Sequence, residues 1–270
     1  MVEDFLYHES NIDGKCRDLR SNRYRGIFRE CIEYKREKYL PYKEGQLRIS
    51  GISQNDIEEK ITLLKQYYIS VNEFQQTHHI TSQSKFRPSI LEEFCGFLFK
   101  DIPKVRSLNL GFFNKDVFAG LGINSQGKAI IRTKNIDFCI GKHFGVTFES
   151  QSEKLIIPVI AIECKTYTDK TMLNEAQFTA QKLKQGSPST KVYILSEGNQ
   201  VANDEIPLKG QTPLDQIFIL RPFLGRDGTK KIYGEINSEV VHNFFTQIVN
   251  DLDTIIAEKQ IPDIGAIMPE

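Results

Sequence analysis

The run from Leu155 to Ile162 is the feature that most constrains how this chain folds. Its residues, LIIPVIAI, are nearly all apolar, so the pattern predicts a strand that is covered on both faces. The run ends in Glu163-Cys164-Lys165. Because side chains alternate along a strand, Glu163 and Lys165 project to one face and Cys164 to the other. A carboxylate and an ammonium group therefore leave a buried strand together.

A second acid, Asp137, lies within the apolar segment that precedes this strand, in a predicted strand over Lys128–Ile140. If the two strands pair as a hairpin over the polar connection 141–154, Asp137 lies beside Glu163. Two carboxylates so close repel each other unless a divalent cation sits between them. Mg²⁺ suits such a site, because it takes oxygen ligands and keeps several waters.

The alternative is structural: Asp137 and Glu163 pair only with Lys165 or Lys134 at a sheet edge. The order of elements favours the chemical interpretation. Periodicity and turn residues predict the following elements from residue 88 onward: a helix from Pro88, an apolar segment Val105–Phe113, strands Lys128–Ile140 and Leu155–Lys165, a helix Thr171–Gln185, and strands Lys191–Ser196 and Gln216–Arg221. With the apolar segment counted as a strand, the order up to Ser196 is thus helix, three strands, helix, strand.

The flanking regions are predicted to be helical. One helix runs from Asn22 to Tyr39 and is stopped by Pro41, and a second starts at Ser53 with a capping-box-like Asp56. A long amphipathic helix passes through Ile236 to Ile255. We therefore divide the chain into an N-terminal helical region (1–85), an α/β core (86–235), and a C-terminal helix with a tail (236–270).

Composition limits the class of protein. The 270 residues carry 35 Lys+Arg and 35 Asp+Glu, and no apolar run approaches the roughly 20 residues that span a bilayer. The first residues, MVEDFLYHESNIDG, lack the apolar stretch of a secretory signal. The five cysteines form no CxxC pair, so buried reduced thiols are favoured over a zinc site. We expect a cytoplasmic globular protein without a membrane partner.

Asp137, followed by Glu163-Cys164-Lys165 in this order of elements, resembles the PD-(D/E)XK nuclease motif, although Ile136 replaces its first proline. Several segments are similar more narrowly to the BbvCI-type restriction endonucleases. These segments are Pro88–Phe94, Asp137–Gly141, Val159–Lys165, Met172-Leu173 with Thr179–Lys184, and Asp215–Arg221. The resemblance implies an α/β restriction-endonuclease-like core, with a central mixed sheet flanked by helices, after an N-terminal helical region.

The resemblance also implies roles for residues. Asp137 and Glu163 would hold Mg²⁺, with the backbone carbonyl of Cys164 as a third ligand, and Lys165 would orient or help deprotonate the attacking water. The expected products carry a 5′-phosphate and a 3′-hydroxyl. In this superfamily a Glu from the first core helix sometimes joins the site. Glu92 is explained by a capping box with Ser89, so Glu93 is the better candidate for this catalytic role.

Basic residues give candidates for DNA contact. Between Lys15 and Lys38 nine basic residues face four acidic ones, interleaved with aromatic side chains. Such a run is either a solvated surface or a clamp on the phosphate backbone. On the helix after the motif, Phe178 and Leu183 are expected in the core. The candidate DNA-binding residues are Arg23, Arg25, Arg29, Lys182, Lys184 and Arg221.

We therefore expect a Mg²⁺-dependent type II restriction endonuclease, or a subunit of one, that hydrolyses double-stranded DNA at a short specific sequence. One chain offers one active site and cuts one strand, so a double-strand break needs a second nuclease subunit, in a homodimer or a heterodimer. The alternatives are another PD-(D/E)XK nuclease, acting in repair or on branched DNA, and a non-catalytic DNA-binding subunit.

Overall fold

The computed structural model describes residues 5–21, 28–78, 86–148, 151–227 and 230–255, and its centre is a mixed five-stranded sheet in the order β1-β4-β5-β6-β7. Strands β1, β4 and β5 pair antiparallel, whereas β5, β6 and β7 run parallel. The strands are β1 (Gly111–Phe113), β4 (Phe138–Phe148), β5 (Gln151–Lys165), β6 (Lys191–Ser196) and β7 (Gln216–Ile219). The predicted α/β class is confirmed.

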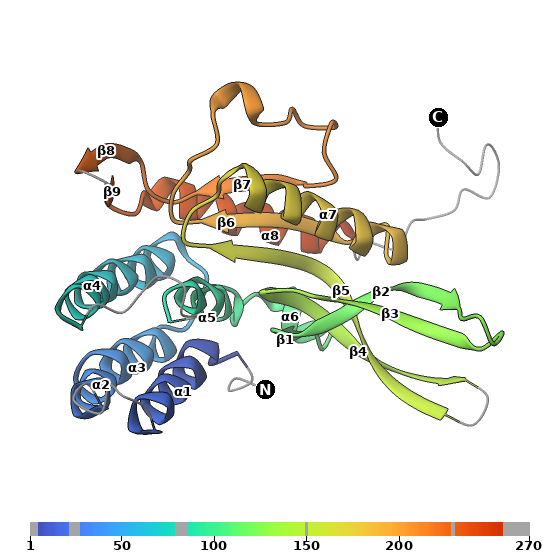
Figure 1. Cartoon of the computed structure of the whole chain (residues 1–270), viewed down its shortest axis with the longest axis horizontal. Coiled ribbons are helices and arrows are strands. Elements are labelled where there is room, and N and C mark those ends of the chain that lie inside the picture. The colour runs from blue at the N-terminus through green and yellow to red at the C-terminus, as the bar shows by residue number, and fades with distance from the viewer. Residues whose placement is uncertain (1–4, 22–27, 79–85, 149–150, 228–229, 256–270) are drawn as a thin grey trace.

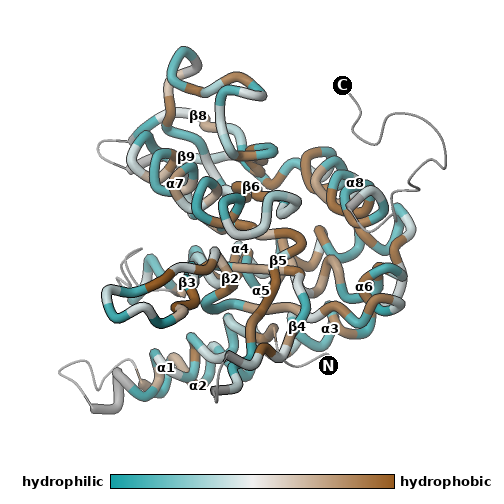
Figure 2. The backbone as a smooth tube through the Cα atoms, turned by 90° about the vertical axis from the view of Figure 1, so that its right-hand side faces the viewer, coloured by the Kyte–Doolittle hydropathy of each residue, from teal (hydrophilic) through white to brown (hydrophobic). Residues whose placement is uncertain are grey.

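Helices surround this sheet (Figure 1). They are α1 (Tyr7–Ser21), α2 (Phe28–Tyr34), a π-helical turn η2 (Lys35–Tyr39), α3 (Leu40–Arg48), α4 (Gln54–His78), α5 (Pro88–Phe99), α6 (Pro103–Ser107), α7 (Lys170–Gly186), a short 3₁₀ turn η3 (Asn203–Glu205) and α8 (Ser238–Ile255). Figure 1 shows α1 to α4 on one side of the molecule, with α5 between them and the sheet. Hydrophobic residues gather in the central sheet, and hydrophilic ones lie on the outer helices (Figure 2).

The two faces of the sheet pack into two separate cores, as the apolar run predicts. On β5, Ile160, Ile162 and Cys164 join a large core that also contains side chains of α1, α4, α5 and α8. Ala161, between them, joins a smaller core with α7 and β2. Because side chains alternate, Glu163 and Lys165 belong to the face that α7 covers. The alternation predicted from sequence is confirmed.

Two short antiparallel ribbons stand outside the main sheet: β2 (Asp116–Ile123) with β3 (Ala129–Asn135), and β8 (Phe223–Asp227) with β9 (Lys230–Tyr233). The prediction of one strand over Lys128–Ile140 is therefore wrong. That segment leaves the β2–β3 ribbon at Asn135 and enters the main sheet at Phe138. Asp137 lies at this break and not inside a strand.

The β4–β5 hairpin is longer than the sequence indicated. The two strands pair from Phe138↔Ile162 to Phe148↔Gln151, so the polar segment 141–154 is mostly strand and not connection. Pro41 does not stop a helix either. It stands at the beginning of α3, directly after the π-helical turn, and α2, η2 and α3 follow one another without a break. The Ser53–Asp56 capping bonds at the start of α4 are present.

The end of α7 packs closely on the β2–β3 ribbon. A Cβ added to Gly186 would lie 2.3 Å from the carbonyl carbon of Ala119 and 2.5 Å from the amide nitrogen of Gly120. Only glycine permits this backbone contact. The contact fixes the ribbon, and with it the segment that leads into Asp137, against the helix that covers the face of the sheet with Glu163 and Lys165.

Two expectations about the whole chain are checked directly. All five cysteines are buried and free, as predicted. Within the described ranges, no helix combines the length and the apolar character that crossing a bilayer requires.

Candidate active site

Three side chains meet where β4 begins and β5 ends. Asp137 precedes β4, and Glu163 and Lys165 lie two residues apart at the end of β5. The Lys165 Nζ donates to Oδ2 of Asp137 at 2.8 Å and to Oε2 of Glu163 at 2.6 Å. The backbone amide of Cys164 donates to the same Asp137 oxygen at 2.9 Å. The structure thus brings together the acids and the lysine that the sequence singled out.

The charges of this cluster shift the pKa values of Glu163 and Lys165. Burial raises the pKa of Glu163, and the negative charge of Asp137 raises it further, whereas Lys165 opposes both effects. Burial by itself lowers the pKa of Lys165, but the carboxylates of Asp137 and Glu163 outweigh it and raise that pKa above its ordinary value. The fold holds Asp137 and Glu163 close together in a buried place, and this disfavours the ionised form of Glu163. A bound cation would relieve the repulsion between the two carboxylates.

An open cleft of about 570 Å³ lies beside these groups. Its lining comprises the three residues above, Lys134 and Asn135 at the end of β3, and Asn174, Glu175, Ala176, Phe178 and Thr179 of α7. The expectation that Phe178 is a core residue is wrong, because 54% of it is exposed. Leu183 is fully buried, as expected.

Asn114, which the sequence analysis missed, links α5 to the site. Its Nδ2 donates to the backbone carbonyl of Asp137 at 2.7 Å and also contacts Oε2 of Glu92. Helix α5 begins at Pro88, so Ser89 lies in its first turn and bonds back to the carbonyl of Phe86. The predicted Ser89–Glu92 capping box is therefore absent, and Glu92 is the glutamate of α5 that Asn114 links to Asp137.

Glu93 lies elsewhere. Its carboxylate accepts hydrogen bonds from the backbone amides of His8 and Glu9, at 3.0 and 3.1 Å, and from the Tyr39 hydroxyl at 3.0 Å. Burial raises the pKa of Glu93 to about 8, and burial also lowers the pKa of His8 to about 3. The structure therefore places the predicted catalytic Glu93 in the contact with α1 and η2, because adjacent residues of a helix point in different directions.

The predicted DNA-binding residues are placed variously. Arg23 and Arg25 lie outside the described residues, and Arg29 is exposed on α2. Lys184 is bound to Asp215 at 2.7 Å, and Arg221 bonds to the Gly234 carbonyl at 2.7 Å and lies 3.4 Å from Glu197. Those two side chains are thus engaged inside the protein. Lys182 lies on α7, with its Nζ 5.2 Å from the centroid of the Phe178 ring.

A divalent metal is compatible with the residues present. Within the described ranges no group of three or more His, Cys, Asp and Glu side chains has a metal-binding arrangement. Asp137 and Glu163 would therefore offer two carboxylates to a metal. Two carboxylates with backbone and water oxygens are a donor set that a hard cation accepts. The observation of this structure that supports the fit is geometric: two carboxylates lie close enough for one Lys165 Nζ to bond both, at 2.8 and 2.6 Å, at the border of an open cleft.

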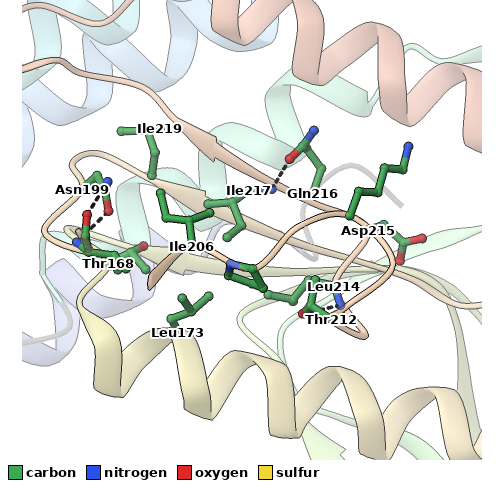
Figure 3. A pocket seen from close by; sticks show the side chains of 13 residues that line it. Thr168, Leu173, Asn199, Ile206, Thr212, Leu214, Asp215, Gln216, Ile217 and Ile219 are labelled. Carbon is green, nitrogen blue, oxygen red and sulfur yellow. Dashed lines mark hydrogen bonds between the residues drawn. The ribbon is translucent and has the colours of Figure 1, made fainter. Parts of the chain in front are cut away.

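A second hollow, of about 160 Å³, lies under the segment that connects β6 to β7 (Figure 3). Leu173, Val201, Ile206, Leu214 and Ile217 make it largely apolar. Asp215 at its border is already bonded by Lys184 and Lys191. The hollow thus lacks the convergent acids of the cleft.

The comparisons with known proteins agree with this geometry. The model of the Bpu10I restriction endonuclease family matches residues 83–227, which is more than half of the chain. No curated protein matches it in sequence. A solved structure described as "native BbvCI A2B2 tetramer at low resolution" is similar in fold, with a TM-score of 0.71 at 19% identity over 96% of this chain and 99% of that one. The chain therefore belongs to the Bpu10I restriction endonuclease family and is a type II site-specific deoxyribonuclease with a restriction-endonuclease-like fold.

Proposed function

We propose that the cleft beside Asp137, Glu163 and Lys165 hydrolyses a DNA phosphodiester bond with Mg²⁺, within a short specific sequence and on one strand per active site. The observation that supports this most is the convergence of two carboxylates and one ammonium group across β4 and β5, next to an open cleft. A structural ion pair needs one acid and one base. Here one lysine faces two acids, and its single positive charge cannot neutralise both.

Asp137 and Glu163 would hold the metal, with the Cys164 carbonyl as a further oxygen ligand. When bound, the metal polarises a phosphoryl oxygen and lowers the pKa of its water, which is worth several kcal/mol of the barrier. Lys165, whose Nζ bridges the two acids, would hold a water or a phosphate oxygen with its third N–H. A fixed positive charge there stabilises the negative charge that grows on the phosphate. The products carry a 5′-phosphate and a 3′-hydroxyl.

The chain would act as one subunit of a larger assembly. The BbvCI protein of similar fold is described as an A2B2 tetramer. By analogy, a second nuclease subunit, identical or different, would cut the other strand. A preparation with one active site per DNA molecule is then expected to nick a supercoiled plasmid, and a complete assembly to linearise it.

The test uses Glu163→Ala and Lys165→Ala, with supercoiled plasmid DNA and Mg²⁺. Both variants are expected to lose cleavage while they keep the circular dichroism of the wild type. Cleavage at the wild-type rate in both would contradict the proposed site, and cleavage in excess EDTA would contradict the role of the metal. Sequencing of the ends of the product reports the specificity.

A further inference from the structure

The wall of the cleft that α7 forms carries an apolar ring where a polar surface is expected. Phe178 is 54% exposed and lines the cleft together with Asp137, Glu163 and Lys165. The buried stripe of the same helix passes through Leu173, Ala176, Ala180 and Leu183, on the other side. A single exposed apolar residue is common on protein surfaces. This one is distinctive because it lies within the cleft that holds the acids.

One lysine contacts that ring and another lines the same cleft, both without carboxylate partners. Lys182 Nζ lies 5.2 Å from the centroid of Phe178, at the distance of a cation–π contact. Lys134, at the end of β3, lines the cleft. In the part of the chain that the structure describes, neither lysine has a carboxylate within ion-pair distance. Lys184, two residues after Lys182 on α7, is in contrast paired with Asp215. Lys134 is therefore available to an anion in the cleft, and Lys182 to one beside the Phe178 ring.

We infer that Phe178, Lys182 and Lys134 form a subsite for the DNA strand that is cut. The Phe178 ring packs on the deoxyribose next to the scissile phosphate, and the two lysines bind the neighbouring phosphates. A sugar–phosphate backbone alternates apolar and anionic groups, and the ring and the ammonium groups match these in kind. Such contacts position the strand and carry no sequence information. This inference rests on the proposed function of the cleft.

A polypeptide partner is the competing occupant of an exposed aromatic residue. The two lysines disfavour it, because the core of a protein interface is depleted in lysine. The neighbouring acids also disfavour an acidic peptide, whereas a divalent cation bound by those acids would offset their charge toward a phosphate strand. A DNA strand with its metal satisfies the ring, the lysines and the acids at once.

The experiment measures the binding of a fluorescent 20-base-pair duplex of mixed sequence in Ca²⁺, which replaces Mg²⁺, over a series of salt concentrations. Each phosphate contact contributes a slope of about −0.9 to log K against log salt. Lys182→Gln and Lys134→Gln are each expected to make the slope about one smaller in magnitude. Phe178→Ala is expected to weaken binding about tenfold at constant slope, because it removes an uncharged contact. Phe178→Tyr keeps the ring and is expected to bind within about twofold of the wild type.

Matched controls separate the subsite from general effects. Phe144→Ala removes a similarly exposed ring (48%) from β4, outside the cleft. Lys170→Gln removes a charge from the first turn of α7, also outside the cleft, where the lysine pairs with Glu205. Both are expected to leave the affinity and the slope unchanged.

Unchanged affinity and slope in Phe178→Ala, Lys182→Gln and Lys134→Gln would overturn the inference, and so would a change in slope in the Phe178 variant alone. A Phe178→Ala protein that changes its oligomeric state but not its DNA affinity would also overturn it and assign the ring to a subunit contact. These outcomes are distinct from failure of the proposed function. In that case the wild type cleaves no DNA with Mg²⁺, or Glu163→Ala and Lys165→Ala cleave normally.

Discussion

The backbone amide of Cys164 donates a 2.9 Å hydrogen bond to Oδ2 of Asp137. This bond joins the end of one strand to the residue before the other, and Lys165 Nζ reaches the same oxygen at 2.8 Å. The position of Asp137 is thus set by the main chain of the strand that carries Glu163 and Lys165. The site is built into the pairing of β4 and β5, and it does not depend on a flexible loop.

Removal of the Asn114 side chain is expected to raise the Mg²⁺ concentration that cleavage requires. In Asn114→Ala the carbonyl of Asp137 loses its 2.7 Å bond, and Glu92 loses its contact. Groups that orient metal ligands typically change metal affinity by about 10- to 100-fold. A titration of the cleavage rate with Mg²⁺ measures the shift. Asn124→Ala, in the β2–β3 turn, is the control with an unchanged midpoint, and the same midpoint in both variants would contradict the positioning role.

Glu163→Gln is expected to abolish cleavage without loss of stability. Burial and the charge of Asp137 raise the pKa of Glu163, so its ionised form is penalised in the folded protein at neutral pH. A neutral amide of the same shape removes that penalty, and we expect a free energy of unfolding unchanged or higher by about 1 kcal/mol. Urea unfolding measures it.

The matched control for that variant is Glu197→Gln. Glu197 is buried between Arg87, at 2.7 Å, and Arg221, at 3.4 Å. Loss of its charge leaves buried cations without their partner, and the expected cost is about 3 kcal/mol. A Glu163→Gln variant as unstable as Glu197→Gln would show that Glu163 is a structural acid and not a strained catalytic one.

The raised pKa of Glu93 predicts that the free energy of unfolding falls as the pH rises. Burial raises its pKa from 4.5 to about 8 in the folded state, so between these values the folded protein binds more protons than the unfolded chain. The contribution is complete below pH 4.5 and is lost as the pH passes through about 8. Because the lowered pKa of His8 gives a slope of the opposite sign below pH 6.5, unfolding in urea between pH 6.5 and 8 should show this fall, and Glu93→Gln should flatten it. An equal slope in both proteins would contradict the assignment.

Gly186→Ala is expected to destabilise the protein and to reduce cleavage together. The new Cβ would meet the backbone of Ala119 at 2.3 Å, so either α7 or the β2–β3 ribbon must move. Overpacking of this kind typically costs 1–3 kcal/mol, and we expect about 2 kcal/mol by urea unfolding. Gly145→Ala, in β4, meets nothing within 4 Å and is the control. Equal stability of the two variants would contradict the close contact.

The sequence predicted which face carries Glu163 and Lys165 because strand alternation is a local rule. Glu163, Cys164 and Lys165 point as the apolar run indicated, and the element order of the main sheet agrees once the β2–β3 ribbon is set aside. The ribbon itself was missed because residues 128–140 read as one β-rich segment. Only the pairing of its two halves with different partners separates them.

The choice between Glu92 and Glu93 required the tertiary structure. Both are buried on α5, and only the position of Asn114 on one side, and of His8 and Tyr39 on the other, distinguishes them. The exposure of Phe178 could have been found from sequence. The stripe of Leu173, Ala176, Ala180 and Leu183 follows helical spacing, and Phe178 lies off it.

The rate of plasmid cleavage by Asp137→Asn, relative to the wild type in Mg²⁺, tests the central claim most directly. Asparagine keeps the shape of the side chain and an oxygen for the Cys164 amide, but it removes the charge that would hold the metal. Because the metal supplies several kcal/mol, we expect cleavage at discrete sites by the wild type and a rate at least about 100-fold lower in the variant. Cleavage by Asp137→Asn at the wild-type rate would contradict the account.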